Sequence, residues 1–311
     1  MSEIRVRVLT GPTAVGKSLW ALRLAREADW EICCMDSMQI YRLLDIGTAK
    51  PSPEERALVP HHLLDILDPR DSFSVAQYRE IAEQTILACA ARDKEVLFVG
   101  GTGLYLQALL HPMALGAIPA DPDLRAALNA QAETAEGRRA LWEKLRTLDP
   151  VTASRLPPQD LRRIIRAIEV TEKTGIPFSA QPASSASSPF SWAVAALNLP
   201  RPILYDRINR RVSGMMDAGL KEEVAALLAE GVPEDAQSMS AIGYRQMVPC
   251  VKGLCSPEQA AAEIALATRH YAKRQLTFLR REPTVSWIDA SSSHVETELR
   301  KALNHFESFE T

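Results

Sequence analysis

A loop with the spacing of a phosphate-binding site lies near the start of the chain. Residues 11–18 read GPTAVGKS and match the pattern G-x-x-x-x-G-K-[ST]. Its glycines let the backbone turn so that successive N–H groups converge on phosphate oxygens. Lys17 brings a positive charge to a phosphate, and the Ser18 hydroxyl can ligate Mg²⁺. The residues that we expect to bind phosphate here are Gly11, Pro12, Thr13, Ala14, Val15, Gly16, Lys17 and Ser18.

The acids that a nucleotide hydrolase needs beside such a loop are hard to find. Walker-type enzymes hold Mg²⁺ with an aspartate at the end of an apolar strand. Here the apolar segment 96–99 is followed by GGTG, without an acid, and no N-K-x-D guanine-binding motif is present. The carboxylate best placed near the phosphates is Asp36, as a Mg²⁺ ligand, a general base or a structural cap of its turn.

Local patterns predict elements that bring these groups to one edge of a sheet. Residues 4–10, IRVRVLT, alternate and favour a strand that runs into the loop, and the apolar spacing after Lys17 predicts a helix. A second strand ends near Asp36, and a third ends near Thr102. Strands that alternate with helices favour a parallel sheet, whose ligands gather at the carboxyl ends of the strands. The expected fold is α/β, with a P-loop NTPase-like parallel sheet flanked by helices.

A helical segment interrupts this pattern between about residues 120 and 175, with no strand in between. One of its helices carries an apolar stripe at positions i, i+3, i+4 and i+7, formed by Leu161, Ile164, Ile165 and Ile168. Strand character returns at 191–199, after a low-complexity stretch at 182–189. We therefore expect a catalytic domain of residues 1–115 and 190–311, interrupted by an all-helical insertion of residues 116–189.

Composition favours an ordinary soluble globular protein. Of 311 residues, 46% are apolar and 24% charged, and neither a signal peptide nor a membrane-spanning stretch is expected. The net charge of −3 argues against a globally basic nucleic-acid binder. Two segments are nevertheless basic, residues 201–211 and residues 264–281. The first overlaps a helix predicted over about 203–230, and the second lies in a long helix predicted from Ser256-Pro257 to about Arg281.

The cysteines and histidines do not follow a zinc-binding pattern. The five cysteines include no C-x-x-C pair and no matching histidine cluster, so we expect free thiols in a reducing cytoplasm. His61 and His62 are adjacent, and neighbouring side chains point in different directions. We expect these two residues to set local structure and not to share an ion.

Seven segments, in order, resemble the motifs of bacterial tRNA dimethylallyltransferases, also called tRNA isopentenyltransferases. They are GPTAVGKS, DSMQIYRLLDIGTAKP, HHLLDILDP, VGGTGLYLQALL, LRRIIRAIEV, AIGYRQ and AKRQLTFLR, and they cover residues 11 to about 281. The resemblance implies a P-loop fold that transfers a prenyl group. The implied donor is dimethylallyl diphosphate, and the acceptor is N6 of the adenosine 3′ of the anticodon (position 37) in tRNAs that read codons starting with U.

The residues make chemical sense for that reaction. Departure of diphosphate from an allylic carbon leaves a developing carbocation, so catalysis mostly means stabilising the diphosphate. The loop with Lys17, and Mg²⁺ on Ser18, can do this, and the resemblance adds Arg207 as a diphosphate ligand. Asp36 fits the base that accepts the amine proton, and Thr102 could hydrogen-bond the diphosphate or the amine. The alternatives are an exposed helix charge for Arg207 and a turn residue for Thr102.

The resemblance also implies contacts with the tRNA anticodon stem-loop, from which the target adenine must be flipped out. For the arginines of the insertion, a solvated helix face is the ordinary alternative to phosphate contact. Tyr244 could stack or pack in the core, and residues 273–275 could pair within the protein. The implied tRNA-contacting residues are Asp36, Ser37, Met38, Gln39, Thr102, Arg125, Gln159, Asp160, Leu161, Arg162, Arg163, Arg166, Ala241, Ile242, Gly243, Tyr244, Arg245, Gln246, Lys273, Arg274 and Gln275.

Departures from the family pattern are small, and three other functions stay open. Leu43 stands where a glycine is usual, and Ser18 replaces the commoner threonine. The alternatives are a small-molecule or nucleotide kinase that uses ATP, a prenyltransferase acting on free AMP, and a non-catalytic RNA-binding module. The insertion and the basic last helix argue against a mononucleotide acceptor. We expect Mg²⁺ as the cofactor, a cytoplasmic location, no membrane contact and no obligate protein partner.

Overall fold

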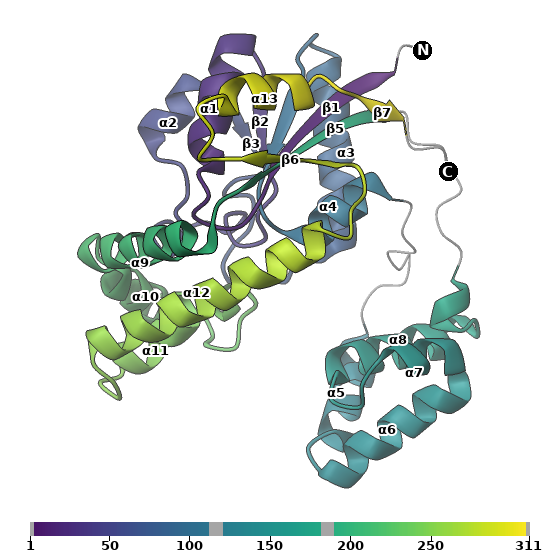
Figure 1. The fold of residues 1–311 in the computed structure, drawn as a ribbon. Coiled ribbons are helices and arrows are strands. Elements are labelled where there is room, and N and C mark those ends of the chain that lie inside the picture. Colours follow the sequence, from purple (N-terminus) through teal and green to yellow (C-terminus); the bar gives the residue numbers. More distant parts are fainter. Residues whose placement is uncertain (1–2, 112–120, 182–189, 309–311) are drawn as a thin grey trace. The chain divides into compact units, whose positions relative to one another are not determined.

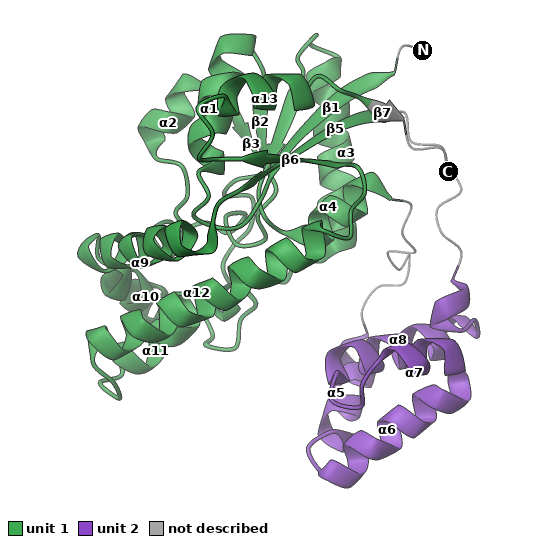
Figure 2. Cartoon of the chain, in the orientation of Figure 1, with its two compact units in different colours: residues 1–111, 187–311 green, residues 112–186 purple. Residues whose placement is uncertain are grey.

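The computed structural model describes residues 3–111, 121–181 and 190–308. The chain forms two compact units, one of residues 1–111 with 187–311 and one of residues 112–186 (Figure 2). The first unit contains the sheet and the phosphate loop, and the second is helical. The predicted domain boundaries at 116 and 189, and the low-complexity stretch at 182–189, lie outside the described residues.

A sheet of seven strands forms the centre of the first unit (Figure 1). The strands are β1 (Ile4–Thr10), β2 (Glu31–Cys34), β3 (His61–His62), β4 (Val96–Val99), β5 (Phe190–Asn198), β6 (Val285–Asp289) and β7 (Glu307–Ser308). Six are parallel in the order β3-β2-β4-β1-β5-β6, and β7 pairs antiparallel with β5. The neighbouring strands β2, β4 and β1 therefore end at one edge, where the phosphate loop, Asp36 and Thr102 follow them. The predicted parallel sheet is confirmed.

Helices cover both faces of this sheet. They are α1 (Lys17–Ala28), α2 (Pro53–Leu58), α3 (Val75–Ala90), α4 (Gly103–Leu110) and α13 (Val295–Ala302). Because side chains alternate along a strand, Leu97 packs with α1 and α13 on one face, while Phe98 packs with α3 and α4 on the other. Both faces are buried, which explains the continuous apolar character of the central strands.

Four further helices form a third apolar cluster with residues 40–44. They are α9 (Arg201–Asp217), α10 (Leu220–Ala229), α11 (Tyr244–Val251) and α12 (Pro257–Leu279). The prediction of one helix over 203–230 is wrong, because Gly219 adopts a left-handed φ of 95° and separates α9 from α10. The predicted cap of α12 is confirmed, since the Ser256 side chain accepts the Gln259 N–H. No helix within the described residues is long and apolar enough to span a membrane.

The second unit is a small helical bundle. Its helices are α5 (Pro122–Gln131), α6 (Ala135–Leu148), α7 (Pro150–Arg155) and α8 (Leu161–Thr174). The predicted stripe of α8 is its core, with Ile164, Ile165 and Ile168 buried and Leu161 packed beside them. Side chains of Asp121, Thr134, Asp149 and Asp160 cap the four helices.

Candidate active site

A cavity of about 320 Å³ opens where the phosphate loop meets the segments that follow β2 and β4. The loop contributes Thr13, Lys17 and Ser18 to its wall. Other polar residues in its wall include Asp36, Ser37, Gln39, Thr48, His61, Arg211, Tyr271, Arg274 and Gln275. The parallel topology thus brings residues from the first and last parts of the chain to one site.

Two glycines shape the phosphate loop. Gly11 has a φ of 134° and Gly16 a φ of 107°, conformations that residues with a side chain rarely adopt. A Cβ at Gly11 would lie 2.5 Å from the carbonyl oxygen of Leu197, so the loop passes directly over β5. Gly16 immediately precedes α1, and the loop therefore ends at a helix N-terminus, where backbone N–H groups favour an anion.

Lys17 folds back onto its own loop. Its Nζ donates hydrogen bonds to the carbonyl oxygens of Gly11 at 3.0 Å and Pro12 at 2.9 Å. Burial and the nearby Arg211 lower the pKa of Lys17 to about 7, although Asp36 opposes the shift. A bound phosphate would favour the ammonium form, because an opposite charge nearby raises the pKa of a lysine.

Two arginines of α9 face the loop, one turn apart. Arg207 Nη1 donates to the carbonyl oxygen of Val15 at 3.0 Å and supports the loop from outside the cavity wall. Arg211 borders the cavity, and its Nη1 lies 3.4 Å from the Thr13 hydroxyl. Arg211 is not among the residues predicted from the sequence, although the i+4 spacing from Arg207 places both side chains on one helix face. A direct diphosphate contact of Arg207 stays a prediction.

The turn after β2 holds Asp36 at the cavity wall. Asp36 Oδ1 accepts the backbone N–H of Met38 at 2.9 Å and of Gln39 at 3.4 Å. Thr102 Oγ1 accepts the N–H of Ser37 at 3.1 Å, which ties this turn to the end of β4. Thr102 thus has the turn-holding role that we considered, and its contact with substrate stays a prediction.

Gln275 joins the phosphate loop to the glycine turn after β4. Its Oε1 accepts the N–H of Thr13 at 2.9 Å, and its Nε2 donates to the carbonyl oxygen of Gly101 at 2.8 Å. Gln275 is buried, and both ends of its amide bond other parts of the protein, whereas Lys273 and Arg274 are exposed. Contact of these three residues with RNA stays a prediction.

Comparison with known proteins identifies the family. Residues 39–282 match the model of the IPP transferase family, and residues 4–65 match an isopentenyl transferase model. A tRNA dimethylallyltransferase of Limosilactobacillus fermentum is 46% identical over 301 residues, covering 96% of this chain and 97% of that protein. The chain belongs to the tRNA dimethylallyltransferase family. The family resemblance is thereby confirmed, and the protein is a prenyltransferase.

Solved structures of tRNA dimethylallyltransferases have the same fold. The tRNA isopentenylpyrophosphate transferase of Bacillus halodurans is 40% identical, with a TM-score of 0.71, covering 97% of this chain and 95% of that one. A eukaryotic dimethylallyltransferase acting on tRNA is 24% identical, with a TM-score of 0.78, covering 96% of this chain and 77% of that one. The first supports both fold and family, and the second supports the fold.

The oxygen atoms at the cavity of this family member suit Mg²⁺. This ion prefers oxygen ligands and usually takes only one or two from a protein, the others coming from phosphate and water. The Ser18 hydroxyl and the Asp36 carboxylate both border the cavity beside the phosphate loop. Ser18 remains the predicted ligand, and Asp36 offers a second oxygen donor.

Gln39, which the resemblance implies as a base-contacting residue, is engaged within the protein. Its Nε2 donates to the carbonyl oxygens of Thr48 at 3.0 Å and Ala49 at 3.2 Å, and its Oε1 lies 3.5 Å from Cys34 Sγ. Gln39 still borders the cavity with Ser37 and Met38. Contact with the target base would require these hydrogen bonds to be exchanged.

The segment 241–246, AIGYRQ, lies mostly inside the first unit. Tyr244 is fully buried, and its hydroxyl donates to the Glu223 carboxylate. Packing in the core is therefore the arrangement observed for Tyr244. Gln246 is buried and caps α11, while Arg245 is exposed. The members of the segment that border the cavity are Ala241 and Ile242.

Charged residues of the insertion divide into paired and exposed groups. Arg125 and Arg166 both bind the Glu169 carboxylate, which is fully buried, at 2.9 and 2.5 Å. Asp160 caps α8, and its carboxylate lies 3.3 Å from Arg163, whose side chain is 74% exposed. Three of the insertion residues predicted to contact RNA are exposed, namely Gln159, Arg162 and Arg163.

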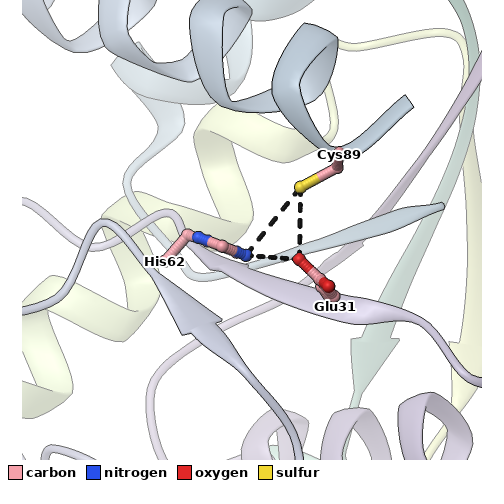
Figure 3. Close-up of side chains that lie close together, drawn as sticks. All are labelled: Glu31, His62 and Cys89. Atoms are coloured by element: carbon pink, nitrogen blue, oxygen red, sulfur yellow. Dashed lines mark hydrogen bonds and ion pairs between the residues drawn. The ribbon is translucent and has the colours of Figure 1, made fainter. Parts of the chain in front are cut away.

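Three potential metal ligands meet outside the cavity wall (Figure 3). Glu31 Oε2 lies 2.6 Å from His62 Nε2 and 3.3 Å from Cys89 Sγ. Arg92 donates to both oxygens of Glu31, at 2.7 and 2.8 Å, and these bonds lower the pKa of Glu31 to about 2. The guanidinium already neutralises the carboxylate, so the cluster joins β2, β3 and α3 as an ion-pair network. His61 diverges from His62 and borders the cavity.

Proposed function

We propose that this enzyme transfers the dimethylallyl group of dimethylallyl diphosphate to N6 of adenosine 37 in tRNAs that read codons starting with U. The products are N6-isopentenyladenosine and diphosphate. The observation that supports this most directly is that Lys17 and Ser18 of the phosphate loop border the same cavity as Asp36. One cavity can therefore receive the donor phosphates and the acceptor amine.

On the donor side, the loop stabilises the leaving diphosphate. Its backbone N–H groups and the N-terminus of α1 favour an anion, and Lys17 and Arg211 add positive charge. Negative charge on the diphosphate increases as its bond to the allylic carbon breaks. These fixed groups therefore bind the transition state more strongly than the ground state, which accelerates the reaction.

On the acceptor side, Asp36 acts as the general base. The N6 lone pair forms a bond to C1 of the allyl group while the C1–O bond to diphosphate breaks, and a proton from N6 moves to the Asp36 carboxylate. Hydrogen bonds from the N–H groups of Met38 and Gln39 orient that carboxylate. Thr102 keeps the same turn in place through Ser37.

Mg²⁺ would be held by Ser18, with Asp36 as a second oxygen donor. When bound, the ion supplies positive charge that offsets the charge of the diphosphate.

The macromolecular substrate in this proposal is the anticodon stem-loop of tRNA. The proposed location of the enzyme is the cytoplasm. Exposed Lys273 and Arg274 on α12, and exposed Arg162 on α8, suit contacts with RNA phosphates. We assign the helical unit to the anticodon arm, and deletion of residues 112–186 is expected to abolish tight tRNA binding.

A transfer assay with Asp36→Asn tests this proposal. The protein is mixed with Mg²⁺, labelled dimethylallyl diphosphate and an anticodon stem-loop carrying adenosine 37. The amide oxygen of asparagine can still accept the N–H groups of Met38 and Gln39, so the turn is kept while the proton acceptor and its negative charge are lost. We expect label in the RNA with the wild type and a rate about 10²–10⁴-fold lower with the variant.

Two further arms make the assay decisive. Label transferred to free AMP and not to the stem-loop would contradict the tRNA acceptor. Hydrolysis or transfer of the ATP γ-phosphate, without prenyl transfer, would favour a kinase.

A further inference from the structure

Glu223 on α10 lies outside the cavity wall but holds a turn that forms part of it. Its Oε2 accepts the N–H groups of Asp45 at 3.1 Å and Ile46 at 2.8 Å, and its Oε1 accepts the N–H of Gly47 at 3.2 Å. Three consecutive backbone N–H groups thus point at one carboxylate. Hydrogen bonds to an ionised acceptor are stronger than those between neutral groups, so this turn is held firmly.

Tyr244 holds the same turn from another side. Its hydroxyl donates to Glu223 Oε1, and its ring is fully buried. A Cβ at Gly47 would lie 2.3 Å from Cε2 of that ring, so the backbone of the turn packs directly on it. The carboxylate and the ring together leave the turn little freedom to move.

Thr48 connects the turn to the reacting groups. Its carbonyl oxygen accepts Nε2 of Gln39 at 3.0 Å and lies 3.4 Å from Nη2 of Arg211. Gln39 belongs to the turn that orients Asp36, and Arg211 faces the phosphate loop. One backbone carbonyl therefore links the acceptor side of the cavity to its donor side.

We infer that Glu223 and Tyr244 are positioning residues for prenyl transfer. They fix the turn 45–48, and through Thr48 they set the places of Gln39 and Arg211. The inference rests on the proposed function, because it takes Gln39 and Arg211 to border the two reacting groups. Glu223 and Tyr244 themselves contact neither substrate.

The first test compares Glu223→Ala with Glu222→Ala, an exposed neighbour on the same helix. The transfer rate at saturating substrates, the KM for each substrate and the melting temperature are measured for both. We expect kcat to fall at least about 10-fold for Glu223→Ala, because small displacements of positioned groups are costly, and to stay unchanged for Glu222→Ala. Tyr244→Phe removes only the hydroxyl and should have an intermediate effect. Glu223→Gln keeps the side-chain size and replaces the alanine variant if that variant does not fold.

The second test separates positioning from general stabilisation. If Glu223 acts through Gln39, its replacement should cost much less in a Gln39→Ala background than in the wild type, because effects of coupled residues are not additive. A fold-loss that is unchanged both in the Gln39→Ala background and in an Arg211→Ala background, or a wild-type kcat for Glu223→Ala, would overturn the inference. Absence of prenyl transfer by the wild type would instead overturn the proposed function, and this inference with it.

Discussion

The side-chain oxygen of Gln275 accepts a hydrogen bond of 2.9 Å from the backbone N–H of Thr13, which is 262 residues away in the sequence. The nitrogen of the same side-chain amide donates a hydrogen bond to the carbonyl oxygen of Gly101. The last long helix therefore clamps the phosphate loop to the glycine turn after β4. This clamp explains how a helix expected to meet RNA also shapes the phosphate loop.

Replacement of Gln275 should weaken diphosphate binding and stability together. Gln275→Ala leaves a buried carbonyl and N–H without partners, which costs about 1–3 kcal/mol in the free energy of unfolding. Gln275→Glu can keep the bond from Thr13 but adds a negative charge beside the loop, so it should weaken dimethylallyl diphosphate binding further. Thermal unfolding and calorimetric titration measure the two effects. Thr277→Ala, an exposed change on the same helix, serves as the control, and an equal result for it would refute the clamp.

Proton uptake should accompany diphosphate binding above pH 7. The pKa of Lys17 is lowered to about 7 by burial and by Arg211, so at pH 8 the free enzyme holds mostly neutral lysine. A bound diphosphate favours the ammonium, and close to one proton should be taken up at pH 8 and much less at pH 6. Calorimetry in buffers of different ionisation enthalpy detects this proton. If the Lys17→Met variant takes up the same proton on binding diphosphate, then a group other than Lys17 accepts it.

The same pKa shift sets the sign of a stability effect. Unfolded lysine titrates near its ordinary value of 10.5, so between about pH 7 and 10.5 the unfolded chain binds more protons than the ligand-free folded chain. The contribution of Lys17 to the free energy of unfolding should therefore rise with pH across this window. From pH 7 to pH 9, the free energy of unfolding of the wild type, measured by denaturant titration, should rise relative to that of Lys17→Met. Equal changes in the two proteins would contradict the lowered pKa of Lys17.

Arginines of the insertion should separate into RNA-contacting and structural residues. Arg162→Ala should weaken stem-loop binding and lower the slope of log affinity against log salt by about one, with stability unchanged. Arg125→Ala removes a partner of the buried Glu169 and should cost up to about 3 kcal/mol of stability. Binding measured over a salt series, with unfolding curves for both variants, tests this division. Equal salt slopes for wild type and Arg162→Ala would rule out the phosphate contact.

Leu43→Gly should stabilise the protein. Leu43 has a φ of 66° and is 48% exposed, so the leucine side chain stands on a left-handed backbone that favours glycine. A left-handed backbone costs a residue with a Cβ about 1–2 kcal/mol, part of which is offset by the greater freedom of glycine in the unfolded chain. The melting temperature should rise for Leu43→Gly and not for Leu43→Ala, which keeps the strained backbone. A rise of equal size for alanine would point to the lost leucine side chain instead.

Much of the architecture is encoded in local patterns. The phosphate loop, the parallel strands that deliver Asp36 and Thr102, and the isoleucine stripe of α8 follow from spacing over a few residues, because backbone conformation and periodic burial depend on near neighbours. The prediction of one helix over 203–230 missed the break between α9 and α10, although Gly219 is a residue type that commonly ends helices.

The partners of the polar side chains were decided by the tertiary structure. Gln275 with Thr13, Glu223 with Gly47, and Arg92 with Glu31 join segments far apart in the chain. A sequence shows which side chains can form hydrogen bonds, but which two approach within 3 Å depends on how the strands and helices pack. For the same reason the sequence pointed to Arg207, while the packing of α9 on the loop brings Arg211 to the cavity.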